Sequence, residues 1–224
     1  MNKIFSIAID GPAGAGKSTV AKAVAKQLGA VYLDTGAMYR TMGLYMQQNK
    51  ISGNDSISKA CVKPELGIRF IGDDQHMILD GVDVTGLIRS SEASMLASKV
   101  SAVAAVRERL VELQREFAKG NSVVMDGRDI GTHVLPDATL KIFLTASCEV
   151  RAQRRHKEIL AKGKTESFDK VLADIVERDF ADSNRAVSPM RQAEDAIRVD
   201  TSNMSQDEVI AHIVALAEKA IQEA

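Results

Sequence analysis

A short glycine-rich stretch near the start of the chain most constrains its fold. Residues 11–18 read GPAGAGKS, which matches the spacing G-x-x-x-x-G-K-[ST]. An apolar run at 4–9 precedes it, and a helix-forming segment at 17–29 follows. This arrangement lets consecutive backbone N–H groups turn around phosphate oxygens at the positive end of a helix. The residues of this phosphate-binding loop (P-loop) are Gly11, Pro12, Ala13, Gly14, Ala15, Gly16, Lys17, Ser18 and Thr19.

Strand-like and helical segments alternate along most of the chain. Short apolar runs predict strands at 4–9, 31–33, 122–125, 140–144 and 197–199. Helices are predicted at 17–29, 37–48, 91–118, 147–162, 167–184 and 205–222. The alternation favours an α/β fold of the P-loop NTPase type, a three-layer sandwich in which helices cover both faces of a five-stranded parallel sheet. We expect residues 1–224 to form a single domain.

One section breaks this alternation. Residues 63–89 carry short β-like runs separated by Asp-Asp, Asp-Gly and Thr-Gly turn signals. Such turns between short strands predict a small antiparallel meander inserted in the α/β unit. The core is then expected to comprise 1–62 and 90–224.

The side chains of Lys17 and Ser18 give the loop its chemistry. Lys17 can reach the β- and γ-phosphates of ATP, and the Ser18 hydroxyl can bind Mg²⁺. The loop alone does not separate a kinase from a switch GTPase or a motor ATPase. However, the guanine-reading sequence Asn-Lys-x-Asp is absent, because the two Asn-Lys pairs continue as NKIF and NKIS. The switch-like DVTG at 83–86 lies in the meander rather than at the end of a core strand.

Arginines follow the predicted strands, where a kinase would clamp the acceptor that receives the phosphoryl group. Arg40 follows the second strand and Arg128 the third. Arg178, Asp182 and Arg185 are spaced by four and three residues, which places them on one helix face. Arginine suits a second phosphate because its fork of donors binds two oxygens at once. Ligands of open parallel sheets bind at the carboxyl ends of the strands, so these residues predict an acceptor site.

Four stretches together resemble the bacterial cytidylate kinase family. They are IDGPAGAGKST, LDTGAMYR, DGRDIGTHVLPDA and RDFADSNRAVSP, and the resemblance runs in order from residue 4 to about 200. It implies an enzyme that transfers the γ-phosphate of ATP to CMP, and also to dCMP, with Mg²⁺. The meander at 63–89 is similar to the monophosphate-binding region of that family. Residues 151–165, which begin RAQRR, resemble a short lid whose arginines close over ATP.

The resemblance also implies roles for individual residues. Thr35 and Arg40 would contact the monophosphate; the pyrimidine would be read by Ser98, Arg107 and Asp129. The acceptor phosphate would be held by Arg128 and Arg185, and the ribose by Arg178 and Asp182. The catalytic set would be Lys17, Arg128, Arg185 and Arg154. In this chain Ala104 stands near the position where many relatives have a proline.

The composition restricts the possible binding partners and the cellular compartment of the protein. The formal net charge is −1, which argues against a broad nucleic-acid surface. Cys61 and Cys148 lack metal or redox spacing, as expected in a reducing cytosol. No run approaches the roughly 18 apolar residues of a membrane span, and the first ten residues are too short an apolar run for a signal peptide. We therefore expect a cytoplasmic monomer whose partners are small molecules. The alternatives to a CMP kinase are a P-loop kinase of another acceptor, or a nucleotide-driven switch or ATPase.

Overall fold

The protein is described by a computed structural model that covers residues 4–161 and 163–224, and it contains the expected parallel sheet. Residues 1–3 and residue 162, which falls within the expected helix 147–162 and lid 151–165, lie outside the described part. The strand order is β2-β6-β1-β7-β8, and every neighbouring pair is parallel. The strands are β1 (Ser6–Asp10), β2 (Val31–Asp34), β6 (Val123–Gly127), β7 (Leu140–Thr145) and β8 (Ile197–Asp200).

The sheet separates two hydrophobic cores, which confirms the three-layer arrangement. Ile7 and Ile9 of β1 pack on one face, whereas Ala8 between them packs on the other. Because successive side chains of a strand point to opposite faces, a continuous apolar run such as β1 fills both cores. The first core is covered by α1 (Lys17–Leu28) and α8 (Gln206–Glu223). The second is covered by α2 (Thr35–Gln48), α4 (Ser91–Ser101) and α5 (Ala104–Lys119).

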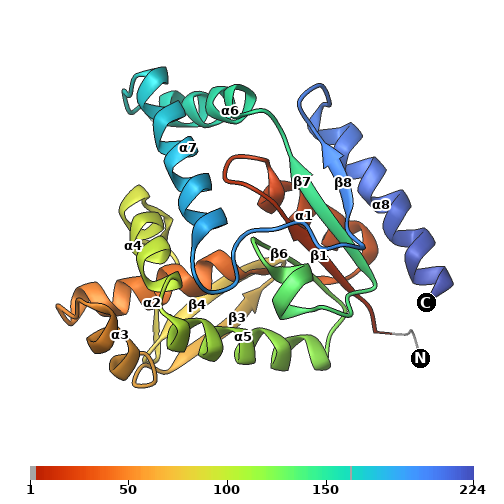
Figure 1. Cartoon of the computed structure of the whole chain (residues 1–224). Coiled ribbons are helices and arrows are strands. Elements are labelled where there is room, and N and C mark those ends of the chain that lie inside the picture. Colours follow the sequence, from red (N-terminus) through yellow and green to blue (C-terminus); the bar gives the residue numbers. More distant parts are fainter. Residues whose placement is uncertain (1–3, 162) are drawn as a thin grey trace.

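The remaining helices lie at the ends of the molecule. Figure 1 shows α6 (Cys148–Ala161) and α7 (Phe168–Asn184) together at the top, as a helical hairpin. A short helix, α3 (Asn54–Ala60), lies at the lower left and was not predicted. It has only two buried side chains, Ile57 and Ala60, so its sequence carries little hydrophobic periodicity. Within the described ranges, no helix is long and apolar enough to cross a membrane.

The predicted meander is confirmed as a separate three-stranded antiparallel sheet in the order β3-β4-β5. Its strands are β3 (Leu66–Ile71), β4 (Asp74–Leu79) and β5 (Val82–Asp83). The sheet docks on the core through Gln75, whose side-chain oxygen accepts a hydrogen bond from the backbone N–H of Asp34 at 2.7 Å. Asp34 ends β2, so the insert is fastened to the carboxyl edge of the main sheet.

The prediction of one helix over 91–118 is wrong, because the chain breaks it between Ser101 and Ala104. Val103 has φ −90° and ψ 119°, an extended conformation that ends one helix and starts the next. Its side chain is buried, so the break lets a β-branched residue enter the core. Ala104 is the first residue of α5, a position where proline is well tolerated.

The close approach of α2 and α4 depends on a glycine. A Cβ atom added at Gly43 would lie 2.7 Å from the Cβ of Leu96 and 3.2 Å from the backbone nitrogen of Ala97. Gly43→Ala should therefore lower the free energy of unfolding by about 1–3 kcal/mol through overpacking, measured by urea titration. Gly120→Ala is the matched control, since it has φ −102° and no neighbouring atom within 4 Å. Equal effects of the two substitutions would contradict the packing argument.

Candidate active site

The phosphate-binding loop connects β1 to α1 and depends on glycine at defined points. Gly11 has φ +143°, and a Cβ there would lie 2.0 Å from the carbonyl oxygen of Leu144. Gly14 and Gly16 have φ +75° and +85°, conformations that other residues rarely adopt. Only glycine fits these backbone angles without strain, and the resulting loop presents N–H groups above the start of α1.

Lys17 and Ser18 lie at the first turn of α1, close to the end of β6. Lys17 is nearly buried, and its Nζ donates to the carbonyl oxygen of Pro12 at 2.7 Å. Burial and the nearby Arg128 lower the pKa of Lys17, while Asp126 opposes that shift. The Ser18 hydroxyl donates to the Asp126 carboxylate at 2.8 Å.

Asp126 is a residue that sequence reasoning did not assign to the site. Its other carboxylate oxygen accepts from the Tyr32 hydroxyl at 2.8 Å. Burial and the nearby Asp34 raise the pKa of Asp126. Its position as an acid directly after the apolar run 122–125 is the sequence signal that could have found it.

A second cluster surrounds Asp129, at the start of a five-residue π-helical turn, η2 (Ile130–Val134). One oxygen of the buried Asp129 carboxylate accepts from Arg107, and the other accepts from Arg185 at 3.2 Å. The guanidinium of Arg107 lies 5.5 Å from the ring centroid of Tyr39. Two predicted base-reading residues, Arg107 and Asp129, are thus in direct contact, whereas Ser98 lies half-buried on α4.

Asp182 brings the predicted helix-face residues to the same edge of the sheet. It accepts a hydrogen bond from Nε of Arg128 at 2.8 Å, and an Arg185 nitrogen lies 3.9 Å from its second oxygen. Burial alone would raise the pKa of Asp182, but Arg128 and the neighbouring arginines lower it. Of the three residues expected on one helix face, Asp182 bonds to Arg128, whereas Arg185 lies just after the last residue of α7 in an extended conformation and contacts Asp129.

The cations here outnumber their partners. Burial and the neighbouring Arg128 lower the pKa of Arg178 to about 10. Among the residues that the structure describes, the buried Nε atoms of Arg178 and Arg40 have no hydrogen-bond partner. Buried donors without acceptors are costly, and a nearby anion would stabilise a buried cation that lies close to other cations. This part of the site is suited to a phosphate group.

Thr35 and Arg40 lie in α2, which begins at the end of β2. Asp34 caps this helix by accepting from the backbone N–H of Ala37 at 2.8 Å, and it also accepts from Arg40 at 2.7 Å. The Thr35 hydroxyl donates to the backbone carbonyl of Asp126 at 2.7 Å. Asp34 therefore orients Arg40, and Thr35 fixes the helix start against β6.

Two of the three arginines of α6, Arg151 and Arg154, contact distant segments of the chain. Both Nη atoms of Arg154 donate to Thr201, beyond the end of β8, at 3.0 and 2.7 Å. Arg151 is buried and donates to the carbonyl oxygen of Ala13 in the phosphate-binding loop at 2.9 Å. It also pairs with Asp179, whose other oxygen accepts from the backbone N–H of Ala13 at 3.2 Å. Sequence reasoning missed this clasp, in which Arg151 and Asp179 fasten the α6–α7 hairpin to Ala13.

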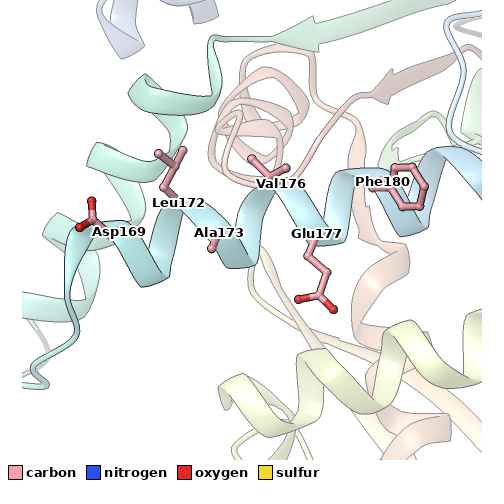
Figure 2. A pocket seen from close by; sticks show the side chains of 6 residues that line it. All are labelled: Asp169, Leu172, Ala173, Val176, Glu177 and Phe180. Atoms are coloured by element: carbon pink, nitrogen blue, oxygen red, sulfur yellow. The ribbon is translucent and has the colours of Figure 1, made fainter.

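The outer face of α7 carries a shallow apolar hollow that is separate from these groups. Leu172, Val176 and Phe180 lie along this face (Figure 2) and line a hollow of about 600 Å³. Its lining comes from α7 alone and includes none of the predicted site residues. Arg178 and Asp182, the α7 residues of the candidate site, do not line this hollow.

A phosphate-binding loop beside a cluster of arginines, both at the carboxyl edge of a parallel sheet, is the arrangement of an enzyme of the P-loop kinase class. The cytidylate kinase family model matches residues 7–219, and the chain belongs to this family. Nucleotide-dependent phosphoryl transfer to a small-molecule nucleotide is the chemistry of such kinases.

Relatives support the assignment along almost the whole chain. A cytidylate kinase of Caldicellulosiruptor bescii is 49% identical over 222 residues, covering 98% of each chain. A cytidylate kinase of Carboxydothermus hydrogenoformans is 51% identical over 94% of this chain and 96% of its own length. A crystal structure of an uncharacterized protein from Eubacterium ventriosum has a TM-score of 0.53 at 14% identity, covering 97% of this chain and 99% of that one. This last likeness shows a shared fold alone.

The clasp predicts a specific loss of stability. Asp179→Ala would leave the buried Arg151 without its carboxylate, so the free energy of unfolding should fall by about 3 kcal/mol. The exposed pair of Arg155 and Glu158, in the same helix, offers the matched control. Glu158→Ala should change the free energy by less than about 0.5 kcal/mol in the same urea titration. Similar losses in both variants would show that Arg151 does not need Asp179.

Proposed function

We propose that this protein catalyses phosphoryl transfer from ATP to CMP, giving ADP and CDP. The observation that carries the proposal is the buried Asp129, held between Arg107 and Arg185. In the part of the chain that the structure describes, the buried Nε atoms of Arg40 and Arg178 add donors without a hydrogen-bond partner. A carboxylate that reads a base next to cations that hold a phosphate is the combination that a nucleoside monophosphate requires. Membership of the cytidylate kinase family supports the choice of acceptor.

The donor side accommodates ATP with Mg²⁺. The phosphate-binding loop would cradle the phosphates, with Lys17 neutralising charge on the transferring group. Ser18 and Asp126, whose oxygens lie 2.8 Å apart, would hold Mg²⁺, and hard oxygen ligands of this kind fit that ion. The ion, when bound, would neutralise charge on the β- and γ-phosphates. A magnesium site of this kind needs few side chains, because phosphates and water supply the other ligands.

The acceptor side favours cytosine over uracil. Cytosine presents an amino donor where uracil presents a carbonyl acceptor. A carboxylate such as Asp129 can accept from the amino group, while a carbonyl facing it would place two acceptors together in a buried site. Arg107 and Ser98 would complete the contact with the base. Arg107 and Arg185 each donate to one oxygen of Asp129, so the cytosine amino group would share this carboxylate with them.

The transfer itself needs no side chain that removes a proton. The second pKa of a phosphate monoester is near 6, so the attacking oxygen of CMP is already largely deprotonated at pH 7. Arg40, Arg128 and Arg185 would hold this phosphate in line with the γ-phosphate, and Arg178 with Asp182 would hold the ribose. Positioning and charge neutralisation then account for the catalysis.

The proposal also covers the movement of the insert and the lid, a second acceptor, the oligomeric state and the cellular compartment. The chain would act as one domain, with the insert 63–89 and the lid 151–165 closing inward to exclude water. For Arg154 to reach ATP, it would have to exchange Thr201 for phosphate. We propose dCMP as a second acceptor, a monomeric enzyme and a cytoplasmic setting, which the two free cysteines suit.

One assay separates this function from its rivals. ADP release should be fast only when CMP or dCMP is present with ATP and Mg²⁺, and slower with UMP, GMP, AMP or shikimate. A nucleotide-driven switch or ATPase would release ADP at the same rate without any acceptor. Preference for another acceptor in the panel would keep the kinase class but overturn the choice of CMP.

The base-reading role of Asp129 predicts a change in selectivity. Asp129→Ala should lower kcat/KM for CMP by at least about 1–3 kcal/mol, the value of a good base contact. The loss for UMP should be smaller, because the substitution also removes the opposed acceptors, so the CMP:UMP ratio should shrink. Arg40→Ala is the control, since a phosphate contact is blind to the base and should slow both acceptors alike. Equal losses in Asp129→Ala would assign the residue a structural role instead.

A further inference from the structure

We propose that Asp10 is a positioning residue that sets the orientation of Asp129 and thereby the preference for cytosine. The inference rests on the proposed function, because it assigns the base-reading role to Asp129. Asp10 is the last residue of β1 and directly precedes Gly11, the first residue of the phosphate-binding loop. Asp10 would thus connect the start of the phosphate-binding loop to the acceptor site.

The carboxylate of Asp10 is fully engaged with the turn that follows Asp129. Its Oδ1 accepts from the backbone N–H of Ile130 at 2.8 Å, and its Oδ2 accepts from that of Gly131 at 2.7 Å. Asp10 itself is 4% exposed, so water cannot replace these contacts easily. The two bonds join residues 120 and 121 positions apart in the sequence.

The turn has no side-chain cap of its own, so Asp10 acts as one. The η2 turn begins after Asp129, and the Asp129 side chain makes no capping hydrogen bond to it. The first N–H groups of a helical turn lack internal acceptors, and a carboxylate at that end satisfies them. Gly131 packs closely against both Lys141 and Asp10. A Cβ atom added at Gly131 would lie 3.1 Å from Cδ of Lys141 and 3.5 Å from Oδ2 of Asp10.

The contact with Ile130 reaches Asp129 through a shared peptide plane. The N–H of Ile130 and the carbonyl of Asp129 belong to the same planar unit. The carbonyl of Asp129 accepts from His133 at 2.9 Å and from Val134 at 3.2 Å, so the plane is held on both sides. Fixing this plane fixes the backbone from which the Asp129 side chain extends toward Arg107 and Arg185.

Because Asp10 can be protonated, its hydrogen bonds with Ile130 and Gly131 are sensitive to pH. Burial raises the pKa of Asp10 to about 6, with Asp129 adding to the shift, while the two N–H contacts and Lys17 oppose it. Lys141 of β7 also lies beside Gly131, with its Nζ paired to Asp195. A protonated Asp10 donates from one oxygen, so one of the two N–H groups loses its acceptor. The orientation of Asp129 is therefore best defined above pH 6 and is relaxed as the pH falls through that value.

The test compares CMP with UMP in Asp10→Asn, a substitution of nearly equal size that leaves only one acceptor oxygen. The CMP:UMP ratio of kcat/KM should fall on the order of tenfold, as for a misaligned base contact, with the KM for ATP little changed. This ratio does not depend on the fraction of folded enzyme. Asp137→Asn, an exposed carboxyl shortly after the turn, is the control and should keep the wild-type ratio.

Two further experiments distinguish a positioning role of Asp10, exerted through Asp129, from a general structural role. In an Asp129→Ala background, Asp10→Asn should leave the ratio unchanged, because the residue through which it acts is gone. In the wild-type enzyme, the ratio should fall as the pH is lowered from 8 to 5.5, with a midpoint of about 6. The second ionisation of the monophosphates affects both acceptors alike and cancels in the ratio.

The outcomes are distinct from those of the proposed function. If the wild-type enzyme does not prefer CMP, the function itself fails before any variant is made. If the wild-type preference is present but Asp10→Asn retains it, or lowers it equally in the Asp129→Ala background, the positioning role is overturned. A raised KM for ATP with an unchanged ratio would assign Asp10 to the donor loop instead. Should Asp10→Asn not fold, a wild-type ratio that is flat across this pH range would overturn the proposal.

Discussion

Repulsion among buried cations is the constraint on which the rest of the active site depends. Burial and Arg128 depress the pKa values of both Lys17 and Arg178, so these groups would separate in a flexible chain. The parallel sheet prevents this, because its strands end along one edge and its two hydrophobic cores leave the strand ends little freedom. The buried carboxylates compensate part of the charge. Over residues 4–161 and 163–224, the buried Nε atoms of Arg40 and Arg178 still have no hydrogen-bond partner, which suits the phosphate that we propose for this site.

Much of this arrangement could be predicted from the sequence, because its signals are local. Strands and most helices follow from apolar periodicity, and the phosphate-binding loop follows from the spacing of its glycines. Arg40 and Arg128 could be placed because they follow strands. The break at Val103 could not be predicted, because it depends on a side chain entering a core formed by distant residues. The short helix α3 carries too little periodicity to be recognised.

The contacts between side chains within the site could not be predicted from the sequence, for a different reason. Asp126, Asp10 and Asp179 each meet partners more than 100 positions away, and nothing near them in the chain indicates those partners. Each is an acid whose significance comes from tertiary contact: Asp126 meets Ser18, Asp10 meets the turn after Asp129, and Asp179 meets Ala13. Asp10 and Asp126 each follow an apolar run directly, which marks a strand end but does not reveal the distant partner.

The clasp of Arg151 and Asp179 also bears on how such an enzyme could diversify. It joins three segments that are separate in the chain: the phosphate-binding loop, α6 and α7. The hairpin therefore is not an interchangeable module, even though it stands apart from the sheet (Figure 1). A chimaera that received its hairpin from another kinase would inherit a working donor loop only if that hairpin supplied both the acid and the arginine. Recombination within the family would thus be constrained at Ala13 by an ion pair formed between two other segments of the chain.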